Sequence, residues 1–458
     1  MQPSVPSHPP VTVTVRHEHN GRLVETSAPF GTIAAAAERL KTYGRKRDIT
    51  GLALRLSECD SEVSLVDISI IFSLELPNLK ILKLISTLPT NDMYDYTQSF
   101  DMEPYPTNSS ADFEDFLSAH AIANPPAFSY HHFLDALSRW STLETILIDN
   151  FLHIPSKDPS NLPRLLCPLV WPNLKDFELR DLPNRVRSLL GYLHLPVHAN
   201  VHLRGSTGLR PLEADMMQEM LPLQPSIYQN IELLDRARFV NVQVGPDALL
   251  VGGATPVPKE HLNMQVLPSS TGSFDTRDVR GGLLRSLLRS LPDMFNPSVV
   301  TFLRIRGDIT WIGSSDDWTG IFTPFHKLEV LILADDTRGL HGFAGAVFDS
   351  LAGDGFDVQE RRIAPVCPRL RFLILMGVSV STGDIGIMRR TLKRRKEKGY
   401  PVSALKLELE VNNCDNTEAQ RAVDSLASAV TETVEWRDMR TNYVHIPSSA
   451  PVPRKRRR

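Results

Sequence analysis

The sequence has little of what most enzymes and metal-binding proteins need. Its 458 residues include only four cysteines, which are isolated and far apart, so no pair of zinc ligands can be drawn from them. It contains no Walker loop, no Gly-x-Gly-x-x-Gly pattern and no Gly-x-Ser-x-Gly elbow. We therefore expect no cofactor and no enzymatic activity. The cysteines are interpreted as small buried side chains: Cys59, Cys167, Cys367 and Cys414.

Long apolar runs are also missing. No run reaches the roughly 18 to 20 residues that a helix needs to span a bilayer. The first ten residues, Met-Gln-Pro-Ser-Val-Pro-Ser-His-Pro-Pro, have neither the basic start nor the apolar stretch of a secretory signal. Hydrophobic residues make up 42% of the chain and charged residues 22%, which is typical of a folded protein. These features predict an intracellular protein without a membrane partner.

What the sequence does contain is a repeat. Its clearest copy is Leu370-x-x-Leu373-x-Leu375, in which alternating leucines would place one side of a short strand in a core. Some copies follow a short segment with proline, such as Leu-Pro-Asn-Leu, Trp-Pro-Asn-Leu or Cys-Pro-Arg-Leu. We predict an α/β leucine-rich-repeat solenoid, with a curved parallel sheet on the concave side and helices and loops outside. The other copies begin at Ile49, Leu79, Leu143, Leu174, Val300, Leu328 and Val402.

The pattern also predicts domain boundaries. The solenoid should cover residues 11–446, with an insertion loop near 87–127 that is rich in Asp, Tyr, Pro, Asn and Ser. Residues 1–10 and the basic tail 447–458 are expected to be disordered. Between the repeats we expect an exposed strand at 11–15, helices at 31–42, 186–195 and 282–291, a loop at 246–272 that includes Gly252 and Gly253, a helix capped by Ser381-Thr-Gly-Asp384, a helix capped by Asn416 and a closing strand at 434–436.

Three clusters of polar residues could suggest chemistry, and each has a simpler explanation. His194, His198 and His202 would share one face of a helix, but Pro196 favours an extended segment, in which residues four apart are about 13 Å apart. The pairs at 316–317 and 335–336 are aspartates at predicted turns, where carboxylates satisfy backbone N–H groups. The basic residues between 389 and 398 fit a solvated helix face near a helix C-terminus. We expect no metal site here and no nucleic-acid contact.

A protein-binding surface can be predicted from the repeat itself. Residues that alternate with the buried leucines should point to the concave face of the sheet. On the strands near 330 and 372 these residues are apolar, and contiguous exposed apolar surface usually marks a contact. The alternative is that a loop at 307–322, or the C-terminal tail, covers them as core. The predicted contact residues are Arg304, Arg306, Val330, Ile332, Phe372, Ile374, Met376 and Lys406.

The irregular repeats, the Pro-Asn-Leu and Pro-Arg-Leu segments, residues 189–203 and the run Leu-Lys-Arg-Arg-Lys-Glu-Lys-Gly before the strand at 402 resemble leucine-rich-repeat F-box-like proteins of mushroom-forming (basidiomycete) fungi. The resemblance implies a substrate receptor of a ubiquitin ligase. In that family an F-box that starts near Leu-Pro-x-Glu binds the Skp adaptor. No such module precedes Val11, so Skp is an expected partner only if an F-box is encoded upstream.

A different class of function is also open: a stand-alone scaffold or inhibitor that is unconnected with ubiquitin. In both cases the partner is a protein, and we expect the chain to be a monomer. The tail ends in five basic residues after Pro453, a pattern typical of nuclear import signals. Cytoplasmic or nuclear localisation is therefore expected.

Overall fold

The computed structural model consists of two compact units, residues 1–210 and 211–458. The predictions for residues 1–10, 87–127 and 447–458 concern residues that the structure does not describe, and Cys59 and Cys167 are also outside the described residues. In the described part of the chain, no helix is long and apolar enough to cross a bilayer. The structure describes residues 11–19, 22–30, 33–42, 48–56, 71–86, 130–152, 168–206, 213, 215–222, 227–245, 248–257, 260–267, 277–335, 343–357, 362–412, 414–439 and 443–445.

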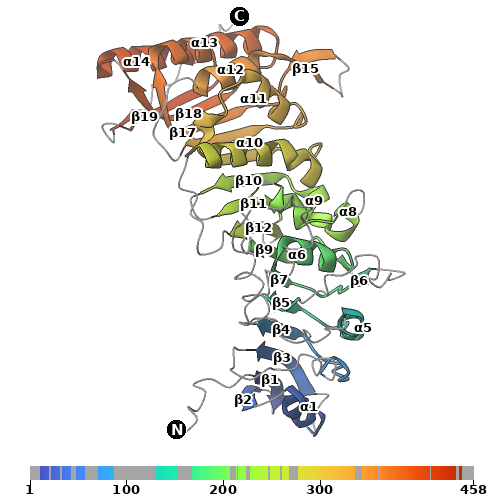
Figure 1. Ribbon diagram of the computed structural model, residues 1–458. Coiled ribbons are helices and arrows are strands. Elements are labelled where there is room, and N and C mark those ends of the chain that lie inside the picture. The colour runs from blue at the N-terminus through green and yellow to red at the C-terminus, as the bar shows by residue number, and fades with distance from the viewer. Residues whose placement is uncertain are drawn as a thin grey trace, which may run out of the picture. The chain divides into compact units, whose positions relative to one another are not determined.

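Unit 1, the part up to residue 210, is built on a sheet in the order β2-β1-β3-β4-β5-β7-β9 (Figure 1). The strands from β3 onward are parallel, whereas β1 is antiparallel to both of its neighbours. The strands are β1 (Val11–His19), β2 (Arg22–Phe30), β3 (Ile49–Leu56), β4 (Ile81–Ser86), β5 (Thr145–Asp149), β7 (Asp176–Asp181) and β9 (Asn200–Ser206), with a separate pair β6 (Leu169–Val170) and β8 (Leu193–His194). The helices are α1 (Ile33–Thr42), α5 (Tyr130–Arg139) and α6 (Pro183–Leu190).

Unit 2 carries strands in the order β12-β11-β10-β13-β14-β17-β18-β19-β20. Strands β10, β13, β14, β17, β18 and β19 are parallel to one another, and β11, β12 and β20 are antiparallel additions. The strands are β10 (Phe239–Val244), β11 (Leu249–Ala254), β12 (His261–Leu267), β13 (Phe302–Gly307), β14 (Val330–Asp335), β17 (Phe372–Ser381), β18 (Ala404–Asn412), β19 (Thr433–Asp438) and β20 (Tyr443–His445), with a separate hairpin β15 (Asp354–Asp357) and β16 (Arg362–Pro365).

Helices cover one face of the sheet in unit 2, and α10 to α13 follow one another along it (Figure 1). This arrangement leaves the opposite face of the parallel strands uncovered by these helices. The helices are α7 (Met216–Glu219), α8 (Ile227–Asn230), α9 (Glu232–Arg236), α10 (Arg277–Met294), α11 (Ser315–Phe322), α12 (Phe343–Ala352), α13 (Thr382–Glu397) and α14 (Asn416–Asp424), with 3-10 turns η4 (Ile309–Trp311) and η5 (Ser425–Ser428).

The leucine pattern predicted the parallel strands correctly. Each of the eight copies forms a strand, and all of their pattern residues are at most 2% exposed. In β17, for example, Leu373 and Leu375 are fully buried while Phe372 is exposed and Ile374 is half-buried. The closing strand at 434–436 and the helix at 31–42 are confirmed as well, by β19 and α1. The predicted core positions of the repeats are therefore confirmed.

The proline-containing segments are turns that precede the strands. In each, the N–H of the first pattern leucine donates to the carbonyl three residues earlier, as Leu174 does to Trp171 at 3.1 Å and Leu370 does to Cys367 at 3.1 Å. Proline fits the second position of such a turn because its fixed φ suits it and its missing N–H is not needed. The same turn occurs without proline from Phe325 to Leu328, at 3.0 Å. The turn therefore belongs to the repeat.

Several expectations about the other elements were wrong. The strand at 11–15 is not exposed, because it lies between β2 and β3 and buries Val11, Val13 and Val15. The expected loop at 246–272 contains β11 and β12. Gly252 and Gly253 favoured a loop, but they lie in β11, and a Cβ on Gly253 would come within 2.6 Å of the Phe295 ring. That glycine leaves room for an aromatic side chain, which sequence alone does not show.

The helix caps give a mixed outcome. Ser381 and Asp384 form the predicted capping box of α13, in which the Asp384 N–H donates to the Ser381 hydroxyl at 3.1 Å. The last helix is capped by the side chain of Asp415, which accepts from the Glu418 N–H at 2.7 Å, and Asn416 is already its first residue. The helix predicted at 186–195 is α6, which begins three residues earlier, at Pro183, and ends at Leu190. Asp and Asn are both favourable N-cap residues, and the predicted cap was wrong by one residue.

One buried carboxylate in unit 1 should make stability depend on pH. Asp181, at the end of β7, is 0% exposed and accepts from the N–H groups of Leu152 at 2.9 Å and Leu182 at 2.8 Å. Burial raises the pKa of Asp181 from 3.8 to about 6, although the Arg185 guanidinium and these N–H groups favour the ionised form. The folded protein therefore holds this proton more tightly than the unfolded chain does.

We expect this group to stabilise the fold fully below about pH 4 and to lose that contribution as the pH rises through about 6. A difference of about two pKa units corresponds to about 3 kcal/mol. Urea unfolding of the wild type and of Asp181→Asn between pH 4 and pH 7 measures it. The wild type should lose stability relative to the Asp181→Asn variant as the pH rises from 4 to 7, and parallel curves would contradict the prediction.

Candidate functional site: the open face of the sheet in unit 2

The candidate site is the open face of unit 2, which we define as the outward side chains of β10, β13, β14, β17 and β18. Strand register arranges these side chains in rows across the sheet. The apolar row consists of Phe239, Phe302, Val330 and Phe372, each paired in register with the next. The second row is Arg304, Ile332, Ile374 and Lys406, and the third is Arg306, Ala334, Met376 and Glu408. All eight predicted contact residues therefore lie on one face.

The apolar row is accessible to a partner. Phe239 is 39% exposed and Phe372 is 41% exposed, at the two ends of the row. Between them, the Phe239 and Phe302 rings are in contact, with centroids 5.5 Å apart and planes tilted by 51°. The apolar surface that these phenylalanine side chains expose to water is unfavourable, because its burial would contribute roughly 25 cal/mol per Å². A contact that buries them would recover it.

Residues 307–322, which we considered as a loop that covers this face, do not cover it. Residues 309–311 and 315–322 are η4 and α11, and α11 packs against α12 on the helix side. Trp318 and Phe322 of α11 are fully buried there. The expectation of a covering loop at 307–322 was therefore wrong, because Ser314 caps a helix whose apolar side chains belong to the core. Ala334, at 7% exposure, is the outward position that is buried.

Charged side chains border the apolar area. Arg304 and Arg306 extend from β13 on one side, and Lys406 extends from β18 on the other. The Nε atom of Arg304 is buried and has no hydrogen-bond acceptor. Lys406 lies 4.0 Å from Glu408, at the limit of an ion pair. Positive charge therefore predominates on the β13 side of the apolar area.

The corresponding face of unit 1 has a different character. There the outward residues of β5, β7 and β9 include charged side chains that pair with one another. Arg180 lies 3.6 Å from Asp149, and Arg204 lies 3.6 Å from Glu178. Burial raises the pKa of Asp149, although the Arg180 charge opposes this. The repeat thus produces both a self-paired polar face and an apolar one, and only the latter has the composition of an interface core.

Sequence reasoning missed one contributor to the apolar row. Phe239 lies on β10, in a region where no repeat was recognised. The structure shows a further copy there, Ala237-x-x-Val240-x-Val242, with all three pattern residues at most 1% exposed. Alanine replaces the first leucine, which hid the pattern. The alternation of valines at 240, 242 and 244 was the available signal. Phe302 was predicted to face outward but was not selected as a contact residue.

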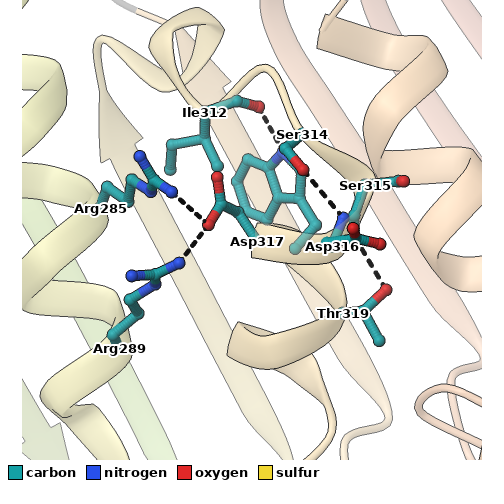
Figure 2. A network of polar contacts seen from close by, with 9 residues as sticks. Arg285, Arg289, Ile312, Ser314, Ser315, Asp316, Asp317 and Thr319 are labelled. Carbon is teal, nitrogen blue, oxygen red and sulfur yellow. Dashed lines mark hydrogen bonds and ion pairs between the residues drawn. The ribbon is translucent and has the colours of Figure 1, made fainter.

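The aspartate pair at 316–317 is structural (Figure 2). Asp317 is 6% exposed and accepts hydrogen bonds from Arg285, at 2.7 Å, and from Arg289. Asp316 is exposed, and its N–H donates to the Ser314 hydroxyl at 3.1 Å. The two carboxylates thus point to different surroundings, and Asp317 ties α10 to α11. Both aspartates lie in the first turn of a helix rather than in the turn that we predicted.

The basic run on α13 is only partly a solvated face. Arg395 is 1% exposed, against our expectation. Lys398 forms an ion pair with Asp354, and hydrogen bonding to Lys398 lowers the pKa of that carboxyl group. The Lys396 ammonium donates to the Ser428 carbonyl at 3.1 Å. The Arg395 guanidinium donates to three main-chain carbonyls, those of Leu351 at 2.9 Å, Val366 at 2.7 Å and Cys367 at 2.8 Å.

The remaining candidates give no site. His194 lies in β8 and His202 in β9, as an extended segment requires, but His198 lies in a turn between them, in which the Ala199 N–H donates to the Pro196 carbonyl at 3.1 Å. Among the described residues, no group of three or more His, Cys, Asp or Glu side chains could hold a metal ion. Cys367 is buried and Cys414 is half-buried, and neither forms a disulfide. Burial raises the pKa of the Cys367 thiol to about 12.

No protein-family model matches the chain, and no curated protein matches it. Among solved structures, the chain is similar to the crystal structure of the leucine-rich repeat-containing protein LegL7 from Legionella pneumophila, at 10% sequence identity. The similarity covers 91% of this chain and 90% of that chain, with a TM-score of 0.28. None of these comparisons supports the resemblance to fungal F-box-like proteins. The function has to be inferred from the residues of the open face.

Proposed function

We propose that this chain is a non-enzymatic, protein-binding leucine-rich-repeat module, and that the open face of unit 2 holds the partner. The observation that carries the proposal is the apolar row, with Phe239 at 39% exposure and Phe372 at 41%, in register with Phe302 and Val330. Interface cores are enriched in aromatic residues and depleted in charge, with a polar rim around them. The cations on β13 and β18 are placed as such a rim.

The double variant Ile332→Ser, Ile374→Ser tests this proposal. Both side chains are half-buried and point to the open face, so their combined loss should change the free energy of unfolding by only about 2 kcal/mol. Partner binding should weaken at least about tenfold, since truncated interface anchors typically cost more than 1 kcal/mol. The measurements are urea unfolding and quantitative capture of partners from extract, with a photo-crosslinker at position 374 to identify them.

The matched control is Leu147→Ser, at an outward position of β5 in unit 1, where it lies next to Lys83 and Glu178. This variant removes a comparable apolar group from the corresponding face of unit 1 and should leave partner capture unchanged. A loss of several kcal/mol of stability in the double variant would show that Ile332 and Ile374 belong to a core, and the proposal would then fail.

As a more specific proposal, the module is the substrate-receptor part of an F-box ubiquitin-ligase subunit. It is supported by the resemblance of residues 189–203 and of the run at 392–399 to fungal F-box-like proteins. A stand-alone scaffold or inhibitor would use the same open face. Co-precipitation with the Skp adaptor distinguishes these two functions. Binding of the adaptor supports the ligase function. If the chain still captures its partner but does not bind the adaptor, the scaffold or inhibitor function is favoured.

We also propose that the basic tail directs nuclear import. Arg454, Lys455, Arg456, Arg457 and Arg458 form an uninterrupted cationic run, the kind of sequence that import receptors bind. Deletion of residues 454–458 should lower the nuclear fraction of a fluorescently tagged chain, measured by microscopy. Replacement of Ser448 and Ser449 by alanine is the control, because it alters the same tail without removing charge. An unchanged nuclear fraction after the deletion would exclude the signal.

A further inference from the structure

We propose that the occupant of the open face is an acidic segment of a partner protein, with apolar side chains on the apolar row and carboxylates on Arg304 and Lys406. This inference rests on the proposed function and adds the chemistry of the partner. The observation that supports it is the arrangement of cations around the two isoleucines, with Arg304 and Arg306 on β13 and Lys406 on β18.

The apolar area sets the size of the segment. Adjacent strands lie about 4.8 Å apart, so the row from Phe239 to Phe372, which spans three strand spacings, is about 14 Å long. Ile332 and Ile374 widen it on the neighbouring row. A length of about 14 Å accommodates two or three apolar side chains of an extended or helical segment. The bound segment of the partner is therefore short, and its ends lie over the residues that flank the apolar area.

Cations lie at both ends of the second row, and Glu408 on the same face lies 4.0 Å from Lys406. In the second row Arg304 and Lys406 are separated by the two isoleucines, again by three strand spacings or about 14 Å. Arg306 adds a further cation beside Arg304. The chain as a whole carries a formal net charge of −3, so this concentration of positive charge is local. A segment with carboxylates about 14 Å apart would match both cations at once.

The geometry of Arg304 favours a carboxylate over other groups. A carboxylate can accept two hydrogen bonds from one guanidinium as a bidentate pair. A basic segment would place like charge against Arg304 and Arg306. A purely apolar segment would cover these cations without supplying a counter-charge. The acidic segment alone satisfies both the apolar row and the guanidinium.

The test is a selection of random 12-residue displayed peptides on the full chain, with the double variant Ile332→Ser, Ile374→Ser for counter-selection. The enriched peptides should combine large apolar residues with Asp or Glu on both sides. Their affinities are measured by fluorescence anisotropy at several salt concentrations. Arg304→Gln should weaken binding about tenfold, and should also reduce the salt dependence. Arg204→Gln, at an outward position of unit 1, should have no effect.

Each outcome is informative. Peptides that require the two isoleucines but are neutral or basic would overturn the acidic partner and leave the proposed function intact. Peptides that bind the double variant equally well, or no enrichment over it, would count against both. A fall in the melting temperature of Arg304→Gln would trace its weaker binding to stability, and Arg306→Gln would then be used for the same comparison. Unchanged affinity in both arginine variants would also overturn the inference.

Discussion

Arg395→Met should lower the free energy of unfolding by about 3 to 5 kcal/mol, since the loss of one partner from a buried charged network carries a cost of this size. The guanidinium is 1% exposed, and burial lowers its pKa to about 10, which still leaves it protonated at neutral pH. Methionine keeps the apolar stem but removes every donor. The carbonyls that lose their donor, those of Leu351, Val366 and Cys367, lie where water cannot easily replace it.

The neighbouring residue provides the control. Arg394 is exposed, and its guanidinium is 4.0 Å from the Asp354 carboxylate. Arg394→Met should change the unfolding free energy by less than about 1 kcal/mol, as is typical of surface ion pairs. Urea unfolding of both variants gives the comparison. Equal, small effects would mean that the three carbonyls find other donors and that Arg395 is not the residue that joins α13 to the segments around 351 and 367.

Leu373→Asp should have an effect of at least about 4 kcal/mol, because it places an unpaired carboxylate in the core of a central strand. Leu373 is 0% exposed on β17, between Leu331 of β14 and Leu405 of β18. The expected phenotype is a chain that is unfolded or aggregated at 37 °C. Circular dichroism and thermal unfolding measure it.

Ile374→Asp is the matched control, one residue away on the same strand. Its side chain points to the open face and is half-buried. The variant should remain folded, with a loss of roughly 1 kcal/mol. The contrast between adjacent residues tests the strand register, since a shift by one residue would exchange the two outcomes. An equal and large loss in both variants would show that the open face is covered.

The parallel strands could be predicted from the sequence because each repeat carries its own signal. Two buried residues that alternate with outward ones, preceded by a turn, define a strand without reference to the rest of the chain. The prediction of strands failed where the conformation of a segment depends on contacts with residues far away in the sequence. Gly253 suggested a loop because the Phe295 ring that occupies its Cβ position is far away in sequence. Ala237 hid a repeat because a small residue fills the place of leucine.

The candidate site was predictable in part for the same reason. Once the strands are placed, alternation fixes which residues face outward, and this was sufficient for Ile332, Ile374 and Phe372. The role of Arg395 could not be predicted, because nothing in a basic run distinguishes the one side chain that points inward. Its carbonyl partners come from segments that the sequence does not bring together. The burial of individual charges is thus a tertiary property, whereas the strand pattern is local.

The turn before each strand has a consequence for how the surface can evolve. One main-chain carbonyl, such as that of Glu329, accepts from the N–H groups of both Arg371 and Phe372 at 2.9 Å, so each strand is aligned on its neighbour at its first residues. The spacing between successive repeats varies, from 28 residues between Val300 and Leu328 to 64 between Leu79 and Leu143, without shifting that alignment. Insertions outside the sheet are therefore tolerated, and outward residues can be exchanged one at a time. Recognition can change while the scaffold stays the same.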